Sequence, residues 1–148
     1  MSETKFWHIQ LNPDISQGPK KVVEILEKTA LIGLNFPKGT PNYHNFHDRM
    51  QIGDIVLVRD GHTPIALVQV TGKWELTENI NDDLDWFRMR RKVKVLDYAT
   101  PNRPKFPKPM GTLEPLIGDT ASRRYVEGWY KTLRGDHMTE NAIALLKA

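Results

Sequence analysis

The segment IGDIVLVRDGHTPIALVQVTGKW, residues 52–74, decides the fold that we predict for this chain. It contains two apolar, β-branched runs, Ile55 to Val58 and Ile65 to Val70, which are typical of β-strands. Between them lies RDGHTP, whose Asp-Gly pair tolerates the positive φ that a hairpin turn requires. Both runs are almost continuously apolar, and strands of that kind are usually buried on both faces. We therefore expect a central β-hairpin inside a small barrel or beneath packed helices.

The composition is that of one globular domain. The chain has 148 residues, of which 39% are hydrophobic and 26% charged, and its net charge of +3 favours anionic partners only mildly. No apolar run could span a bilayer, and the N-terminus does not look like a signal peptide. The absence of cysteine excludes disulfides and thiolate metal sites and fits a cytoplasmic location. We predict a single domain over residues 1–148, with 117–148 as a C-terminal helical extension.

Apolar periodicity and turn residues predict the other elements. In chain order we expect a strand over 6–11, a helix over about 18–28, a strand over 31–34, a short helical turn within 45–50, the hairpin, a strand over 86–96, an extended loop over 100–115, and two helices over about 120–134 and 140–147. Gly135-Asp136 separates the last two. This order predicts an α+β fold in which about three helices flank a small, mostly antiparallel, barrel-like sheet.

A row of basic side chains marks the predicted strand over 86–96. Strand alternation places Phe87, Met89, Arg91, Val93 and Val95 on one face. It places four basic residues on the other face, namely Arg88, Arg90, Lys92 and Lys94. Neighbours on one strand face are ~6.6 Å apart, which is close to the phosphate spacing of a nucleic acid strand. We predict that these four residues bind phosphates, the alternative being an outer sheet face covered by solvent.

The order of these segments resembles that of EVE domains, which belong to the PUA-like superfamily and are related to YTH domains. The resemblance is carried by FWHI at 6–9 with NPD at 12–14, by the strand that ends near GLN at 33–35, and by the hairpin phrases IGDIVL at 52–57 and ALVQV at 66–70. Trp86 precedes the basic strand, where YTH domains carry a cage tryptophan. The resemblance covers residues 5–98, and the order of the motifs carries it more than any single motif does.

The resemblance implies a PUA-like domain that reads a modified base in DNA or RNA. Prokaryotic relatives stand at the N-terminus of modification-dependent restriction systems of the McrBC type. It therefore also implies a defence context, with a nuclease or AAA+ motor as a further domain or subunit. The YTH cage takes one aromatic residue from the strand after the first helix, but residues 32–36 here are IGLNF, without tryptophan. A cage in this chain would be built with Phe36, Tyr43 or Trp74. The resemblance therefore does not indicate which modified base the domain would recognise.

Trp74 and Trp86 bracket the segment after the central hairpin, and we predict that they wall a pocket for a flipped base. Stacking on an aromatic residue stabilises a bound base by ~1–3 kcal/mol, about as much as flipping costs, so hydrogen bonds to the base edge are also needed. Candidates for these bonds near the strand ends are Asn35, Asp60 and Gln10. The alternative is that both tryptophans pack in the core, as we expect for Trp7 and Trp129.

We therefore expect a non-enzymatic domain that reads a modified base flipped out of duplex DNA, in a prokaryotic defence or restriction context. Three alternatives stay open: a reader of modified RNA, a small metal- or carboxylate-dependent enzyme, and a plain protein-interaction module. The enzyme would use His44, His47 and Asp48 with Asp60 and His62, or the acidic run Asp82, Asp83 and Asp85. Neither spacing matches a strong metal-binding pattern. We expect no membrane partner and no cofactor.

Overall fold

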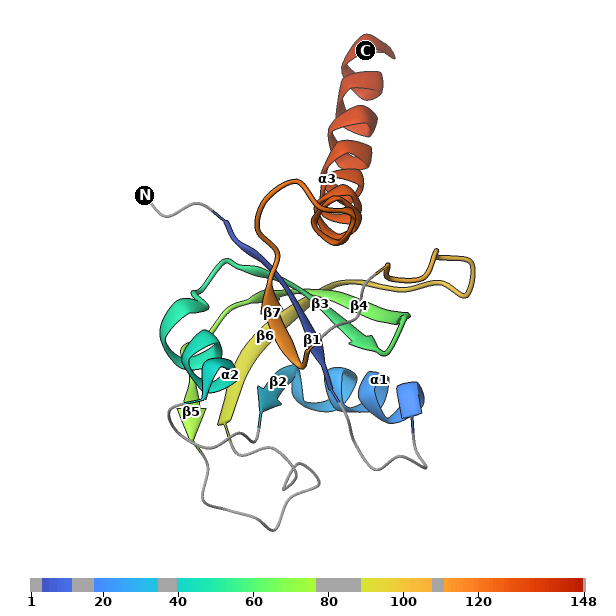
Figure 1. Ribbon diagram of the computed structural model, residues 1–148. Helices are drawn as coiled ribbons and strands as arrows, with labels where there is room; N and C mark the ends of the chain where they lie inside the picture. The colour runs from blue at the N-terminus through green and yellow to red at the C-terminus, as the bar shows by residue number, and fades with distance from the viewer. Residues whose placement is uncertain (1–3, 12–17, 35–39, 77–88, 108–110, 148) are drawn as a thin grey trace.

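The computed structural model describes residues 4–11, 18–34, 40–76, 89–107 and 111–147. Figure 1 shows its elements, which in chain order are β1 Phe6–Gln10, α1 Gly18–Thr29, β2 Leu31–Leu34, α2 Pro41–His44, the π-helical turn η1 Asn45–Arg49, β3 Ile55–Asp60, β4 Thr63–Val70, β5 Glu75–Leu76, β6 Met89–Tyr98, β7 Leu113–Pro115 and α3 Ala121–Lys147.

These strands form a curled, mixed sheet in the order β2-β6-β4-β3-β1-β7, and β5 also pairs with β6. The pair β1 and β3 is parallel, with Phe6 opposite Ile55, and the other described pairs are antiparallel. The predicted hairpin is β3–β4, where Asp60 faces Thr63 and Gly61 has the expected positive φ of 59°. The predicted α+β class, with a small barrel-like sheet flanked by helices, is therefore confirmed.

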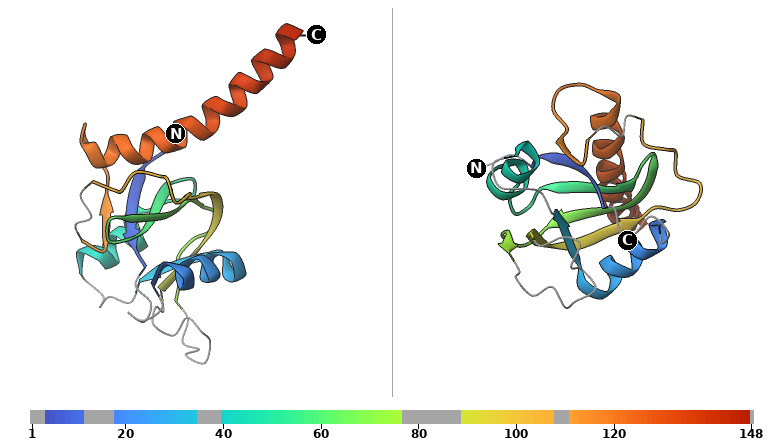
Figure 2. Two further views of the ribbon diagram at one scale, coloured as in Figure 1. Left: turned by 90° about the vertical axis from the view of Figure 1, so that its right-hand side faces the viewer. Right: turned by 60° about the horizontal axis from the view of Figure 1, so that its bottom comes forward.

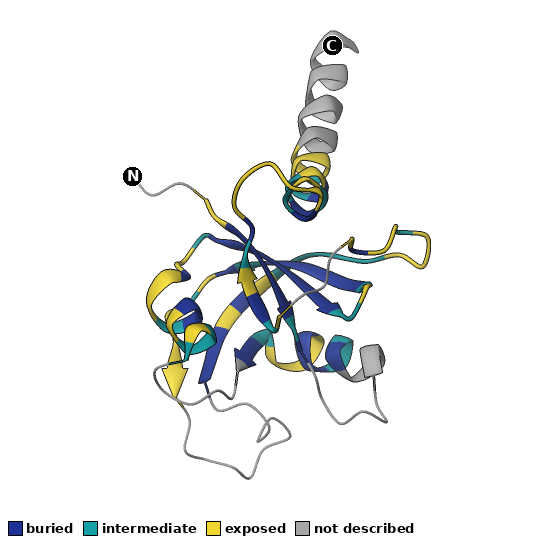
Figure 3. Ribbon diagram, in the orientation of Figure 1, coloured by how far each residue is buried: buried dark blue, intermediate teal, exposed yellow. Residues whose placement is uncertain are grey.

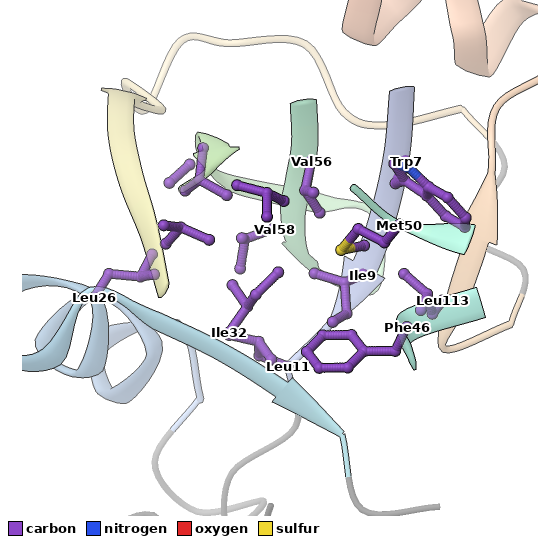
Figure 4. Packing of buried hydrophobic residues seen from close by; sticks show 14 of the residues in the cluster. Trp7, Ile9, Leu11, Leu26, Ile32, Phe46, Met50, Val56, Val58 and Leu113 are labelled. Atoms are coloured by element: carbon purple, nitrogen blue, oxygen red, sulfur yellow. The ribbon is translucent and has the colours of Figure 1, made fainter. Parts of the chain in front are cut away.

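The main core fills the inside of the curl. Val56 and Val58 of β3 point into it together with Trp7 and Ile9 of β1. Figure 4 shows how the rest of the chain closes over them with Leu11, Leu26, Ile32, Phe46, Met50 and Leu113. Trp7 is 1% exposed, which confirms its predicted place in the core.

A second apolar cluster lies on the outer face of the same strands. Ile55 and Leu57 point there and pack with Val126 and Trp129 of α3, which crosses the outside of the sheet in Figure 2. Because alternate residues of β3 enter the two clusters, the strand is buried on both faces, as predicted, and it is dark blue in Figure 3. No helix in the described part of the chain is long and apolar enough to cross a membrane.

The C-terminal third differs from the prediction in two ways. Residues 121–147 form a single helix, although Gly135-Asp136 was expected to end it. A glycine inside a helix costs about 1 kcal/mol relative to alanine, which weakens a helix without ending it. In addition, the predicted loop over 100–115 contains β7, in which Pro115 lies opposite Trp7 of β1. Because β7 is at the edge of the sheet, the missing N–H of Pro115 interrupts no ladder.

The predicted helical turn within 45–50 is longer than expected and has two parts. The side chain of Thr40 caps α2 by accepting a hydrogen bond from the Tyr43 N–H at 3.3 Å, and Pro41 takes the first helical position. The chain then widens into η1, in which the Met50 N–H donates to the Asn45 carbonyl at 2.8 Å. Such π-helical turns are rare and are frequently found at functional sites.

Candidate functional site

A surface cavity of about 390 Å³ lies between η1, the turn before β3 and the segment after β4. Its lining residues are His47, Met50, Gln51, Ile52, Lys73, Trp74 and Arg91. Ligand pockets typically measure about 300–1,000 Å³ and combine apolar or aromatic walls with a few polar groups. The volume of the cavity therefore lies within the range of ligand pockets.

Two of the residues that line this cavity, His47 and Trp74, have aromatic rings in contact, and these rings form one of its walls. The His47 ring lies 4.0 Å from the Trp74 ring between centroids, at an interplanar angle of 31°. Tyr43 stacks on His47 at 5.2 Å and 16°. Trp74 is nevertheless 38% exposed, so part of the indole is left for a ligand. The wall thus offers a flat apolar surface that two further rings support.

Asp48 orients the histidine in this wall. Its carboxylate contacts Nδ1 of His44 at 2.8 Å and Nδ1 of His47 at 2.5 Å. Hydrogen bonds from His44 and then from His47 hold the pKa of the Asp48 carboxyl below its usual value. These contacts fix the position of His47 against Trp74.

The side chains of the predicted metal-site alternative are dispersed. His44, His47 and Asp48 lie at η1, whereas His62 contacts the Phe106 carbonyl through Nδ1 at 2.8 Å, and Asp60 accepts a hydrogen bond from Gln10. Among the residues that the structure describes, no group of three or more potential ligands is placed to hold a metal ion. Asp82, Asp83 and Asp85 lie outside the described residues.

Arg91 forms the buried side of the cavity and joins its walls. Its Nε donates to the Phe46 carbonyl at 2.9 Å, and its Nη2 donates to the carbonyls of Met50 and His47 at 2.7 and 3.4 Å. Its Nη1 donates to the Gly72 carbonyl at 3.1 Å, on the opposite wall. Carbonyls at the end of a helical turn have no partner within the helix, and Arg91 supplies one.

Arg91 is 4% exposed, and burial lowers the pKa of its guanidinium while the carboxylate of Asp54 acts in the opposite direction. An arginine keeps its charge in proteins, so all four bonds are charge-assisted. Strand alternation predicts that Arg91 points inward with Met89 and Val93, and this is confirmed. Its role was missed, although a single arginine in an apolar strand face indicates a buried cation that needs several acceptors.

The turn over residues 51–54 holds Ile52 at the rim of the cavity. The Asp54 N–H donates to the Gln51 carbonyl at 3.1 Å, and Gly53 has a φ of 99°, which a type II turn requires at its third residue. The buried Asp54 carboxylate accepts hydrogen bonds from the Gln51 N–H at 3.0 Å, from the Trp7 indole at 3.0 Å and from the Lys5 N–H at 3.2 Å. The turn is therefore anchored to the core through Trp7.

The structure separates the residues predicted to bind phosphates. Lys92 and Lys94 are exposed, as expected. Arg90 is only 8% exposed, which corrects its place on an open strand face. At this position β6 pairs with both β2 and β5, with Gly33 and Glu75 opposite Arg90. Arg88 lies outside the described residues.

Lys73 is a cationic residue of the site that sequence reasoning missed. It is exposed and lines the cavity beside Trp74. A Cβ added to the preceding Gly72 would lie 3.2 Å from the Lys92 Cβ, so Lys92 is close to the same rim. Lys73 and Lys92, which we call the rim lysines, therefore lie on or near the edge of the cavity, and Lys94 follows two residues further along β6.

The predicted base-pocket residues are only partly brought together. Trp74 lines the cavity, but Gln10 and Asp60 lie at the tip of the β3–β4 hairpin, across the domain from β5 in Figure 1. There Gln10 Nε2 donates to Asp60 at 2.9 Å, while its Oε1 accepts from Arg59 at 2.9 Å and from the Gly61 N–H at 2.7 Å. Both side chains thus hold the turn rather than reaching Trp74. Asn35 and Trp86 lie outside the described residues.

No protein-family model matches this sequence, and no curated protein matches it. Among solved structures, the chain is similar to the crystal structure of protein Atu2648 from Agrobacterium tumefaciens, with 13% sequence identity and a TM-score of 0.39. The match covers 83% of this chain and 90% of that one. A likeness of this size assigns no function.

Proposed function

We propose that this chain is a non-enzymatic nucleic-acid-binding domain that holds a modified base, flipped out of duplex DNA, in the cavity beside Trp74. The observation that carries the proposal is the combination of a partly exposed indole in a cavity of about 390 Å³ with the exposed Lys73 in the cavity lining and the exposed Lys92 close to it. An aromatic face binds a base, and cations at the edge bind the phosphates that flank it. The resemblance of residues 5–98 to EVE domains supports the same assignment.

The energies of base binding indicate what else the site must supply. Flipping a base costs a few kcal/mol in lost pairing and stacking, and stacking of the base on Trp74 would stabilise the complex by ~1–3 kcal/mol. The edge of the base must therefore be bound as well. The donor groups of Arg91 already bond four carbonyls, whereas the exposed Gln51 lines the cavity and its amide offers both a donor and an acceptor. Gln51 is our candidate for reading the edge of the base.

From the resemblance to EVE domains we further propose that the domain acts in a prokaryotic cytoplasm, in a defence or restriction system of the McrBC type. In such a system the domain would recognise the modified site, and a nuclease or AAA+ motor, as another domain or subunit, would act on the DNA.

Replacing Trp74 with alanine should reduce the affinity for a modified duplex by ~1–3 kcal/mol, roughly 5- to 150-fold, because the stacking surface is lost. The measurement is binding at fixed salt to four duplexes of one sequence, which are unmodified or carry 5-methylcytosine, 5-hydroxymethylcytosine or N6-methyladenine. We expect one modified duplex to bind most tightly. Trp74→Phe is the matched control, since it keeps an aromatic face and should retain much of the affinity.

Equal binding of the parent to all four duplexes, or Trp74→Ala binding within about twofold of the parent, would contradict a base pocket at Trp74. A strong preference for modified RNA that depends on the 2′-hydroxyl would select the RNA alternative instead.

Removing Lys92 and Lys94 together should weaken binding by a similar factor for modified and unmodified duplexes, because lysine–phosphate contacts carry no base information. If each lysine neutralises one phosphate, the slope of log Kobs against log salt should become shallower by ~1.8. The measurement is a salt titration of the double variant Lys92→Ala/Lys94→Ala. Lys131→Ala is the control, since Lys131 lies on α3 and pairs with Glu127 at 2.8 Å. A slope that stays at the parent value would show that neither lysine contacts a phosphate.

A further inference from the structure

We propose that Ile52 is a wedge that enters the base stack of duplex DNA and takes the place of the flipped base. The inference rests on the proposed function of the Trp74 cavity and adds a second part to it. The pocket binds the extruded base, and Ile52 fills the gap that the base leaves behind. Proteins that kink or open DNA insert apolar side chains such as isoleucine between base steps in this way.

The exposure and position of Ile52 carry the inference. Among the described residues, four large hydrophobic side chains are exposed, and these are Ile52, Trp74, Leu76 and Ile117. Ile52 is 56% exposed and lines the same cavity as Trp74. The group that would replace the base and the group that would stack on it are thus parts of one site.

The turn that carries Ile52 is held rigidly, as a wedge requires. A hydrogen bond between Asp54 and Gln51 closes the turn, the Asp54 carboxylate binds the Gln51 N–H, and the Gly53 N–H donates to the Val70 carbonyl at 2.8 Å. Isoleucine is itself stiff because of its β-branch. Separating two stacked bases costs a few kcal/mol. A stiff side chain on a rigid turn adds little conformational entropy to that cost when it is inserted.

The charges around Ile52 indicate duplex nucleic acid rather than an apolar protein surface as the partner. The rim lysines Lys73 and Lys92 would face the phosphates on either side of the opened step. Exposed lysines are depleted at the centres of protein–protein interfaces, whereas they are the usual contacts of the DNA backbone.

The test compares the parent with Ile52→Ala and with Ile117→Ala, which removes an equally large exposed side chain that does not line the cavity. The probes carry whichever of 5-methylcytosine, 5-hydroxymethylcytosine and N6-methyladenine the parent binds most tightly. Each variant is titrated with the paired duplex, with the modified strand alone, and with a duplex that has an abasic site opposite the modified base. The fluorescence of 2-aminopurine beside the modified base reports unstacking.

Ile52→Ala should bind the paired duplex about tenfold more weakly than the parent and should bind the single strand within about twofold of it, because only the duplex must be opened. The abasic duplex should show an intermediate loss, and the rise in 2-aminopurine fluorescence should be smaller. Ile117→Ala should match the parent throughout.

An equal loss for single strand and duplex would show that Ile52 merely lines the pocket, and no loss on the duplex would show that it has no role in opening DNA. Either result overturns the wedge and leaves the base pocket standing, provided that Trp74→Ala still loses affinity for the modified strand. If the parent binds no modified strand or duplex in preference to the unmodified one, the proposed function fails and the wedge fails with it.

Discussion

Arg91→Met should lower the free energy of unfolding by about 3–5 kcal/mol, because it removes a buried cation on which four backbone carbonyls depend. Methionine fills a similar volume, so the effect comes from the lost hydrogen bonds rather than from a large cavity. Each buried carbonyl without a partner costs about 1–3 kcal/mol, and water entering from the open side of the cavity would offset part of the sum. The carbonyls of Phe46, Met50 and Gly72 contribute most, since their bonds are the shorter ones.

The measurement is urea unfolding at pH 7, with the m-value checked against that of the parent. Arg124→Met is the matched control: Arg124 is exposed and pairs with the exposed Asp119, so its removal should change the free energy of unfolding by less than about 1 kcal/mol. Arg91→Lys should fall in between, because an ammonium group cannot reach both walls as a planar guanidinium does. A loss below about 1 kcal/mol for Arg91→Met would contradict the assigned role.

Arg91 also positions the walls of the cavity. The bonds to Phe46, His47 and Met50 hold one wall of the cavity, and the bond to Gly72 holds the segment that carries Trp74. We therefore expect Arg91→Met to lose affinity for modified DNA even at temperatures where the variant is folded. Arg91 acts here as a positioning residue, so its loss should leave the salt dependence of the remaining binding unchanged.

Lowering the pH from 7 to 4 should cost about 3 kcal/mol of stability through His8 alone. Burial, and secondly the charge of Arg59, lower the pKa of His8 from 6.5 to about 4 in the folded protein. The His8 side chain is 3% exposed, and its Nδ1 accepts a hydrogen bond from Arg59 Nε at 3.0 Å, so no proton can occupy that nitrogen while the bond exists.

The sign of this effect follows from the two protonation states. At pH 7 His8 is neutral in both the folded and the unfolded chain, and the full stability is present. As the pH falls below 6.5, the unfolded chain binds a proton that the folded protein excludes, so stability is lost between about pH 6.5 and pH 4. Below pH 4 the folded protein also takes up the proton, and this contribution stops changing.

His8→Gln isolates the contribution, because glutamine offers Arg59 an acceptor but does not titrate. We subtract the unfolding free energy of the variant from that of the parent, and this difference should fall by about 3 kcal/mol between pH 7 and pH 4. The subtraction cancels the contributions of the other titrating groups, such as Asp48. The pKa of His8 can also be read from the NMR titration of its ring protons. A value near 6.5 in the folded protein, or a difference that does not change with pH, would rule the effect out.

Local sequence determined the elements whose burial depends on near neighbours in the chain. The Asp-Gly turn, the β-branched runs of β3 and β4, and the proline at the start of α1 were sufficient to predict the hairpin and the first helix. The same periodicity predicted that Trp7 and Trp129 are buried. In each case the pattern repeats within a few residues, so hydrophobic burial and backbone geometry lead to the same result.

Strand pairing decided the rest, because it joins residues that no local pattern connects. Alternation put Arg90 on the open face of β6, but Arg90 is buried at a position where β6 pairs with both β2 and β5. Gln10 and Asp60 stand at strand ends, as predicted, and the parallel pairing of β1 with β3 places them at the hairpin tip instead of beside Trp74. Only the tertiary structure brings η1, Arg91 and the Gly72–Trp74 segment together. The carbonyls that accept hydrogen bonds from the buried guanidinium are far from Arg91 in the sequence, so no local pattern predicts them.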